Sequence, residues 1–151
     1  TGDSHQGTST TPPLESLDTD LDPFRHLITI GDRQAVMIGH LVVPGLTAGE
    51  PASLSPAAVD DLLRTQLGFD GLVFTDDLSG MRAVTDRYGA AEAVRRSLVA
   101  GVDMPLLVST GPVGPIVERL AVLVGTDQLP TARLDEAVSR VLGAKGVPRC
   151  P

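Results

Sequence analysis

The chain has 151 residues, a mass of 15.7 kDa and a formal net charge of −7, with 12 basic and 19 acidic residues. This length allows one domain at most, and the acidic balance argues against nucleic acid or an anionic membrane surface as the main partner. Cys150 is the only cysteine, which excludes an internal disulfide framework and a cysteine-based zinc site. No apolar run is long enough to span a membrane.

The first part of the chain predicts a loop, a short helix, a strand and a second helix. Residues 1–23 are rich in Gly, Pro, Ser and Thr, and they predict a long exposed loop. Asp22-Pro23-Phe24 predicts the start of a helix that ends by Gly31. The continuous apolar run at residues 35–40 is typical of a strand buried on both faces. A helix is expected at residues 57–67, with Ser55 as its N-cap, Pro56 as its first residue and Gly68 as its stop.

The second part continues the alternation of strands and helices. We expect a buried strand at 71–75 that ends in Asp76-Asp77, followed by a helix at 90–100 that Gly101 closes. A strand at 103–108 comes next, and then helices at 113–124 and 131–144 and a tail at 145–151. The 131–144 helix is expected to turn Leu134, Val138, Val141 and Leu142 inward.

These elements define an α/β fold with parallel strands. Each crossover between strands spans roughly 30 residues, which is the length that a βαβ unit requires. The strands could belong to a small open sheet or to part of an eight-stranded barrel, and the periodicity fits both.

Polar side chains follow each predicted strand, where reactive groups collect in parallel α/β folds. They are His40 after the first strand, Asp76-Asp77 after the second and Ser109-Thr110 after the third. Adjacent aspartates on an extended backbone point to opposite sides, so one can face a pocket while the other caps the following turn. For His40, packing at a strand end with one hydrogen bond is the alternative to a role in catalysis, and His26 is expected on the surface.

Asp3 and His5 stand two positions apart on the opening loop and therefore project the same way from an extended backbone. A carboxylate beside an imidazole fixes its tautomer and suits it to general acid–base work. Solvated loop residues are the alternative. The chain contains no P-loop, no dinucleotide-binding glycine pattern, no zinc-binding His-Glu-x-x-His and no Gly-x-Ser-x-Gly motif, so no cofactor or metal is expected.

A series of motifs resembles the catalytic barrel of glycoside hydrolase family 3, in its β-N-acetylglucosaminidase (β-N-acetylhexosaminidase) branch. In chain order they are Gly2-Asp3-Ser4-His5, Asp22-Pro23-Phe24, Val36-Met37-Ile38-Gly39-His40, Pro51-Ala52-Ser53-Leu54-Ser55, the run from Leu67 to Ser79 that contains Phe74-Thr75-Asp76-Asp77, and Ala100-Gly101-Val102-Asp103. Several motifs in one order are far more specific than any one alone.

The resemblance implies a retaining glycoside hydrolase that releases N-acetylglucosamine from peptidoglycan fragments of the bacterial cell wall. It implies that Asp76 is the nucleophile, that His5 is the acid/base and that Asp3 orients His5. The resemblance does not imply that Asp77 is a nucleophile. We also expect His40 and Met81 among the substrate-binding residues.

The resemblance further implies that the chain is the C-terminal portion, about strands six to eight, of a TIM (β/α)₈ barrel. In this interpretation residues 1–23 form the acid/base loop, 24–146 the β/α units and 147–151 the tail. A lone portion would expose the sides of its strands that face the barrel, so a companion chain is expected to supply the N-terminal portion. Gly80 before Met81 is typical of lipoprotein-type members and favours the cell envelope over the cytoplasm.

Two alternatives remain open. Because a histidine acid/base carries no fixed negative charge, phosphate could replace water as the acceptor, which would make the reaction a phosphorolysis. In the second alternative the chain is a non-catalytic, carbohydrate-binding half-barrel.

Overall fold

A computed structural model describes residues 2–30, 34–109, 111 and 113–147 of the chain. Its centre is a parallel sheet of order β2-β4-β5, formed by β2 (Ala35–Ile38), β4 (Leu72–Asp77) and β5 (Met104–Leu106). A second parallel pair joins β1 (Ser9–Thr10) to β3 (Leu41–Val42). The predicted α/β class with parallel strands is therefore confirmed.

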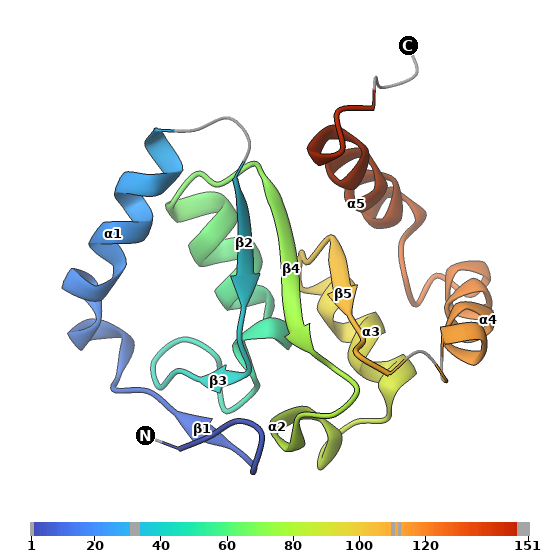
Figure 1. Ribbon diagram of the computed structural model, residues 1–151, viewed down its shortest axis with the longest axis horizontal. Helices are drawn as coiled ribbons and strands as arrows, with labels where there is room; N and C mark the ends of the chain where they lie inside the picture. The colour runs from blue at the N-terminus through green and yellow to red at the C-terminus, as the bar shows by residue number, and fades with distance from the viewer. Residues whose placement is uncertain (1, 31–33, 110, 112, 148–151) are drawn as a thin grey trace.

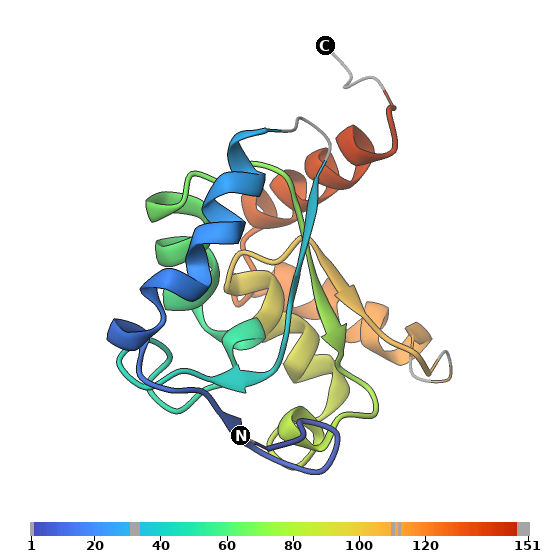
Figure 2. The ribbon, with the colours of Figure 1, turned by 60° about the vertical axis from the view of Figure 1, so that its left-hand side comes forward.

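The helices cover one face of the central sheet. The helical segments are η1 (Leu14–Ser16), α1 (Asp18–Thr29), η2 (Ala52–Leu54), the π-type η3 (Ala57–Gln66), α2 (Arg82–Thr85), α3 (Ala90–Val99), α4 (Val113–Gly125) and α5 (Thr131–Ala144). Figure 1 shows the sheet toward the viewer with η3 and α3 behind it, and the turned view in Figure 2 again shows these two helices on one side. None of the helices described in the structure is long and apolar enough to cross a membrane.

Two apolar clusters hold the helices against the sheet. One is centred on α3 and joins it to α4 and η2, and its fully buried members include Leu78, Val84 and Leu129. The other places Val59 and Leu63 of η3 against Val73 of β4. Gly68 and Gly101 adopt φ values of +71° and +105° at the ends of η3 and α3, which side-chain-bearing residues rarely adopt. The predicted stops at both glycines are thus confirmed.

The opposite face of the sheet is partly uncovered. Alternation along β4 puts Val73 and Thr75 toward the helices and Leu72, Phe74 and Asp76 on the other side. Phe74 pairs in register with Met37 and Met104, which are 54% and 39% exposed. The prediction that residues 35–40 are buried on both faces is therefore wrong, because β2 is an edge strand that pairs only with β4 among the described residues.

Several predicted boundaries also differ. Residues 1–23 are not one loop, since they contain β1, η1 and the start of α1. Helix α1 begins at Asp18 and not near Asp22, with Pro23 inside it. Proline removes one helical hydrogen bond, but α1 has no buried residue, so water can satisfy the free carbonyl. Arg25 contributes to the earlier start through ion pairs of 2.5 and 2.8 Å with Asp18 and Asp22.

Other differences are smaller. Strand β4 runs on to Asp77, strand β5 is shorter than predicted and still contains Pro105, and helix α2 was not predicted. On α5 the buried residue is Ala137, whereas Val138 is 54% exposed and not inward as expected. At η3 the backbone carbonyl of Ser55 accepts the Ala58 and Val59 N–H groups, so the first helical bonds are made by the main chain of Ser55. Cys150 and Gly31 lie outside the described residues.

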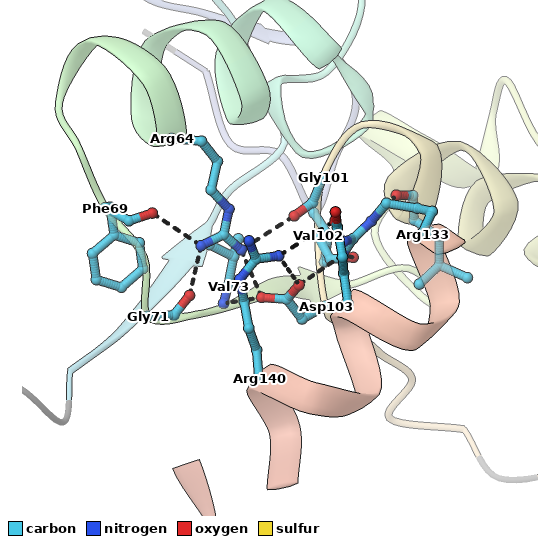
Figure 3. Close-up of polar contacts among 11 residues, drawn as sticks. Arg64, Phe69, Gly71, Val73, Gly101, Val102, Asp103, Arg133 and Arg140 are labelled. Carbon is cyan, nitrogen blue, oxygen red and sulfur yellow. Dashed lines mark hydrogen bonds and ion pairs between the residues drawn. The ribbon is translucent and has the colours of Figure 1, made fainter. Parts of the chain in front are cut away.

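A buried ionic cluster lies where β5 begins, at the end of the sheet opposite to Asp76 (Figure 3). The fully buried Asp103 carboxylate accepts hydrogen bonds from Arg64 and Arg133 at 2.6 Å and from Arg140 at 3.2 Å. It also accepts the Val73 N–H at 3.0 Å. Burial lowers the pKa of Arg64, and the Asp103 charge opposes that effect. This one carboxylate thereby joins η3, β4 and α5.

Candidate active site

The double aspartate lies at the carboxyl end of β4, which is where parallel α/β folds place reactive groups. The two side chains have different surroundings, as their adjacency predicts. Asp76 lies on the partly uncovered face of the sheet, and one of its carboxylate oxygens accepts the Asp77 N–H at 2.8 Å.

The Asp77 carboxylate is held by the turn that follows it and by the chain after β5. Its Oδ1 atom accepts the Ser79 N–H at 2.8 Å, the Ser79 hydroxyl at 2.5 Å and the Val108 N–H at 3.0 Å. Burial alone would raise the pKa of Asp77, but these hydrogen bonds outweigh it and lower the pKa below its ordinary value. The interpretation of one aspartate as a turn cap therefore fits Asp77.

His40 follows β2 and is only 1% exposed. Its Nε2 atom lies 3.0 Å from the Asp77 carbonyl oxygen, and its Nδ1 atom lies 2.7 Å from the Ser53 hydroxyl. Because a carbonyl can only accept, Nε2 carries the proton and Nδ1 accepts from Ser53. Burial lowers the pKa of His40, which favours this neutral form.

Asp3 and His5 form a hydrogen-bonded pair on the opening segment. The Nδ1 atom of His5 lies 2.8 Å from Asp3 Oδ1, and the His5 N–H donates to the same oxygen at 2.9 Å. The backbone bond from His5, followed by the side-chain bond, lowers the pKa of Asp3. Since the carboxylate can only accept, Nδ1 is the donor, and Nε2 is the ring nitrogen that this bond does not use. The His5 side chain is 73% exposed.

The opening segment is held by hydrogen bonds at the carboxyl end of the sheet, which is the end that carries Asp76. The Ala83 N–H, in α2, donates to the Ser4 carbonyl at 3.1 Å. Arg87 donates to the Gly49 carbonyl at 2.6 Å and to the Thr8 hydroxyl at 3.3 Å. Figures 1 and 2 both show this segment beside α2, below the carboxyl end of β4. The two sequence-predicted groups, Asp3-His5 and Asp76, thus lie at one end of the sheet.

The remaining predicted residues are placed as follows. Met81 is 2% exposed, and its carbonyl accepts the Val84 and Thr85 N–H groups at the start of α2. Ser109 donates its N–H to the Ser79 hydroxyl at 3.1 Å, and Thr110 lies outside the described residues. His26 is on α1, which has no buried residue. The contacts of His40 and Met81 with a sugar stay a prediction.

Sequence reasoning missed the residues that support these groups. Ser53 and Ser79 both lie within the quoted motifs, but no spacing rule indicated that they contact His40 and Asp77. Tyr88 was also missed; its hydroxyl donates to the Glu50 carboxylate at 2.7 and 2.8 Å and joins the loops after β3 and α2. Over residues 2–30, 34–109, 111 and 113–147, no group of three or more His, Cys, Asp or Glu residues could hold a metal ion.

Comparisons with known proteins identify the family to which the chain is similar. The Glycosyl hydrolase family 3 N terminal domain matches residues 1–144. Beta-hexosaminidase LpqI of Mycobacterium tuberculosis is 52% identical over an alignment of 151 positions that covers 96% of this chain and 38% of that protein. A beta-hexosaminidase of Stenotrophomonas maltophilia is 41% identical over 107 residues, which is 70% of this chain and 31% of that protein. The chain therefore spans about a third of the length of these curated relatives.

Solved structures show the same similarity. The structure of M. tuberculosis LpqI superposes with a TM-score of 0.93 at 50% identity, over 99% of this chain and 45% of that one. A family 3 beta-N-acetylglucosaminidase from Paenibacillus sp. superposes with a TM-score of 0.88 at 34% identity, over 96% of this chain and 28% of that one. From the family match, the identity and the shared fold, we conclude that the chain belongs to glycoside hydrolase family 3.

Proposed function

We propose that the chain supplies the reacting residues of a retaining β-N-acetylglucosaminidase that acts on peptidoglycan-derived fragments. The observation that carries this proposal is the Asp3–His5 pair, 2.8 Å apart, on a segment bonded to α2 just after the strand that bears Asp76. The relatives are described as beta-hexosaminidases and a beta-N-acetylglucosaminidase, which supports an amino sugar as the substrate.

In the first step a carboxylate oxygen of Asp76 attacks the anomeric carbon and the glycosidic C–O bond breaks. His5, protonated on both nitrogens, gives its Nε2 proton to the leaving oxygen. In the second step His5 takes a proton from water as that water attacks the anomeric carbon, and the bond to Asp76 breaks. Asp3 holds Nδ1–H throughout and stabilises the imidazolium form.

The rest of the (β/α)₈ barrel would come from an N-terminal portion, in the same polypeptide or as a companion chain. The relatives are longer proteins, and β2 and β5 each pair on one side only within the part of the chain that the structure describes. On their partly uncovered face lie Met37 and Met104. Strands that extend the sheet from both edges would cover these side chains and place Asp76 at the rim of a barrel.

Trapping the intermediate tests the nucleophile. The protein, together with its N-terminal portion, is treated with an activated fluorinated N-acetylglucosamine donor, and peptide mass spectrometry locates the adduct. We expect the sugar on Asp76, loss of turnover in Asp76→Asn, and retained affinity of that variant for N-acetylglucosamine. An adduct on another residue contradicts the proposed nucleophile, and no turnover by the parent protein supports the binding-module alternative.

Product identification distinguishes hydrolysis from phosphorolysis. We expect an aryl N-acetylglucosaminide to give free N-acetylglucosamine at a rate that added phosphate does not change. A sugar phosphate as the product would show that phosphate replaces water in the second step.

A further inference from the structure

Asp77, the residue after Asp76, is held by hydrogen bonds to residues that follow both neighbouring strands. On the β2 side, His40 donates Nε2–H to the Asp77 carbonyl at 3.0 Å. On the β5 side, the Asp77 carboxylate accepts the Val108 N–H at 3.0 Å. Between these contacts, the Asp77 N–H donates to the Asp76 carboxylate at 2.8 Å. Asp77 therefore supplies the N–H that orients the Asp76 carboxylate, and His40 fixes the carbonyl of this same residue.

The ring of His40 is itself fixed. Ser53 is fully buried, its N–H donates to the Gly39 carbonyl at 3.2 Å, and its hydroxyl lies 2.7 Å from His40 Nδ1. A hydroxyl that donates to Nδ1 leaves the proton on Nε2, which is the tautomer that the Asp77 carbonyl requires. Ser53, His40 and Asp77 thus form a chain of hydrogen bonds from η2 to the end of β4, in which Ser53 donates to His40 and His40 donates to the Asp77 carbonyl.

We propose that His40 is a positioning residue for the reaction: it acts through the Asp77 carbonyl to hold the Asp76 carboxylate in its attacking orientation. This inference rests on the proposed function, because it assigns no chemistry to His40 itself. A reacting group misplaced by about 1 Å loses on the order of 10²-fold in rate. Loss of the Nε2 donor should therefore lower kcat, while sugar contacts made elsewhere keep KM nearly constant.

The glutamine and asparagine variants of His40 separate the two ring nitrogens. A glutamine amide can place an N–H near the position of Nε2, whereas the shorter asparagine reaches only the position of Nδ1. In the protein with its N-terminal portion, we expect His40→Gln to keep kcat within about threefold. We expect His40→Asn to lower kcat about 10- to 100-fold with KM changed less than about threefold. Equal losses in both variants, or a loss confined to KM, would overturn the positioning role.

Ser53→Ala gives a second test that keeps the ring. Without the hydroxyl the imidazole loses its fixed tautomer, and we expect kcat to fall about 3- to 10-fold at constant KM.

If His40→Asn does not fold, as judged by circular dichroism and its thermal midpoint, unchanged kcat in Ser53→Ala overturns the proposal. If Asp76→Asn is as active as the parent, the proposed function fails. If Asp76→Asn is inactive and all His40 and Ser53 variants are fully active, only the positioning role fails.

Discussion

At the scale of single residues, the same residue types have different roles because their surroundings differ. Asp76 and Asp77 are neighbours in sequence, yet Asp77 receives three hydrogen bonds on one oxygen while Asp76 lies on the partly uncovered face. His5 is largely exposed beside a carboxylate, whereas His40 is buried between a hydroxyl and a carbonyl. An exposed, carboxylate-bound imidazole can exchange protons with a substrate, and a buried neutral one can direct a hydrogen bond.

Replacing Asp3 tests the pairing with His5. Asp3→Asn removes the charge that stabilises the His5 imidazolium and fixes Nδ1–H, so we expect kcat to fall by roughly 10²-fold. Steady-state kinetics on an aryl N-acetylglucosaminide measure the change. Gln6→Ala is the matched control and should keep full activity, because it removes only a side-chain bond of 3.4 Å to the other Asp3 carboxylate oxygen and keeps the backbone bond from Gln6 to the Asp3 carbonyl. Equal activity of Asp3→Asn and the parent would contradict the role of the pair.

At the scale of elements, side chains from different elements meet at each end of the sheet. At the carboxyl end, β2, β4 and α2 bring together His40, Asp77 and the docked opening segment. At the amino end, the Asp103 cluster joins η3, β4 and α5 through buried charges. Polar groups at the carboxyl end are available for chemistry, and those at the amino end contribute to stability, as in other parallel α/β folds.

Neutralising Asp103 tests the amino-end cluster. Asp103→Asn leaves Arg64, Arg133 and Arg140 without their shared counter-charge, and we expect a loss of about 3–5 kcal/mol in the free energy of unfolding. Urea denaturation measures this loss. Glu136→Gln is the control, because Glu136 pairs with Arg133 on the exposed side of the cluster, and it should cost under about 1 kcal/mol. Similar costs in the two variants would contradict a central role for Asp103.

Glu92 on α3 predicts a pH dependence of stability. The hydrogen bond with Arg95, helped by Arg96, outweighs the opposing effect of burial and lowers the pKa of Glu92 from 4.5 to about 2. A carboxyl group whose pKa is lower in the folded than in the unfolded protein stabilises the folded state at pH values above its unfolded pKa. For Glu92 this contribution disappears as pH falls from about 4.5 to about 2. We therefore expect Glu92→Gln to be less stable by under about 1 kcal/mol at pH 7, since solvent reaches the partly exposed Glu92 and screens the pair. The difference in unfolding free energy should vanish near pH 2, and a constant difference would contradict it.

At the scale of the whole molecule, the sheet has apolar side chains that nothing in the described chain covers. Met37 of β2 and Val108, which follows β5, are more than half exposed, and Met104 and Leu106 of β5 are more than a third exposed. Two apolar cavities, of about 390 and 240 Å³, lie between α1 and β2. Such surfaces are typical of a face that another segment covers.

This surface predicts association. We expect native mass spectrometry of the chain to show it bound to its N-terminal portion, or self-associated when that portion is omitted. Met37→Lys should weaken the association, because it places a charge on the uncovered face of edge strand β2. Asp135→Lys, on the exposed side of α5, is a charge-changing control that should leave it unchanged. A single 15.7 kDa species under both conditions would contradict the expectation.

The sequence alone determined the succession of parallel strands and helices along the chain, because apolar runs and glycine stops are properties of neighbouring residues. The resemblance of its motifs to glycoside hydrolase family 3 singled out Asp76, His5 and Asp3 as candidate site residues. The same rules failed where contacts beyond the local pattern matter. The ion pair of Arg25 with Asp18, seven residues earlier, contributes to the start of α1, and Ala35 and Met37 are exposed because β2 lies at a sheet edge.

Only the tertiary structure decided how the site is supported. The contacts from Ser53 to His40 and from His40 to Asp77 join residues 13 and 37 positions apart, and Asp77 meets Val108 across 31 positions. No periodicity in the sequence encodes such distances, because they depend on which strands become neighbours in the sheet. The proposed reacting groups could therefore be named from the sequence, whereas the hydrogen bonds around them appeared only when the strands were placed side by side.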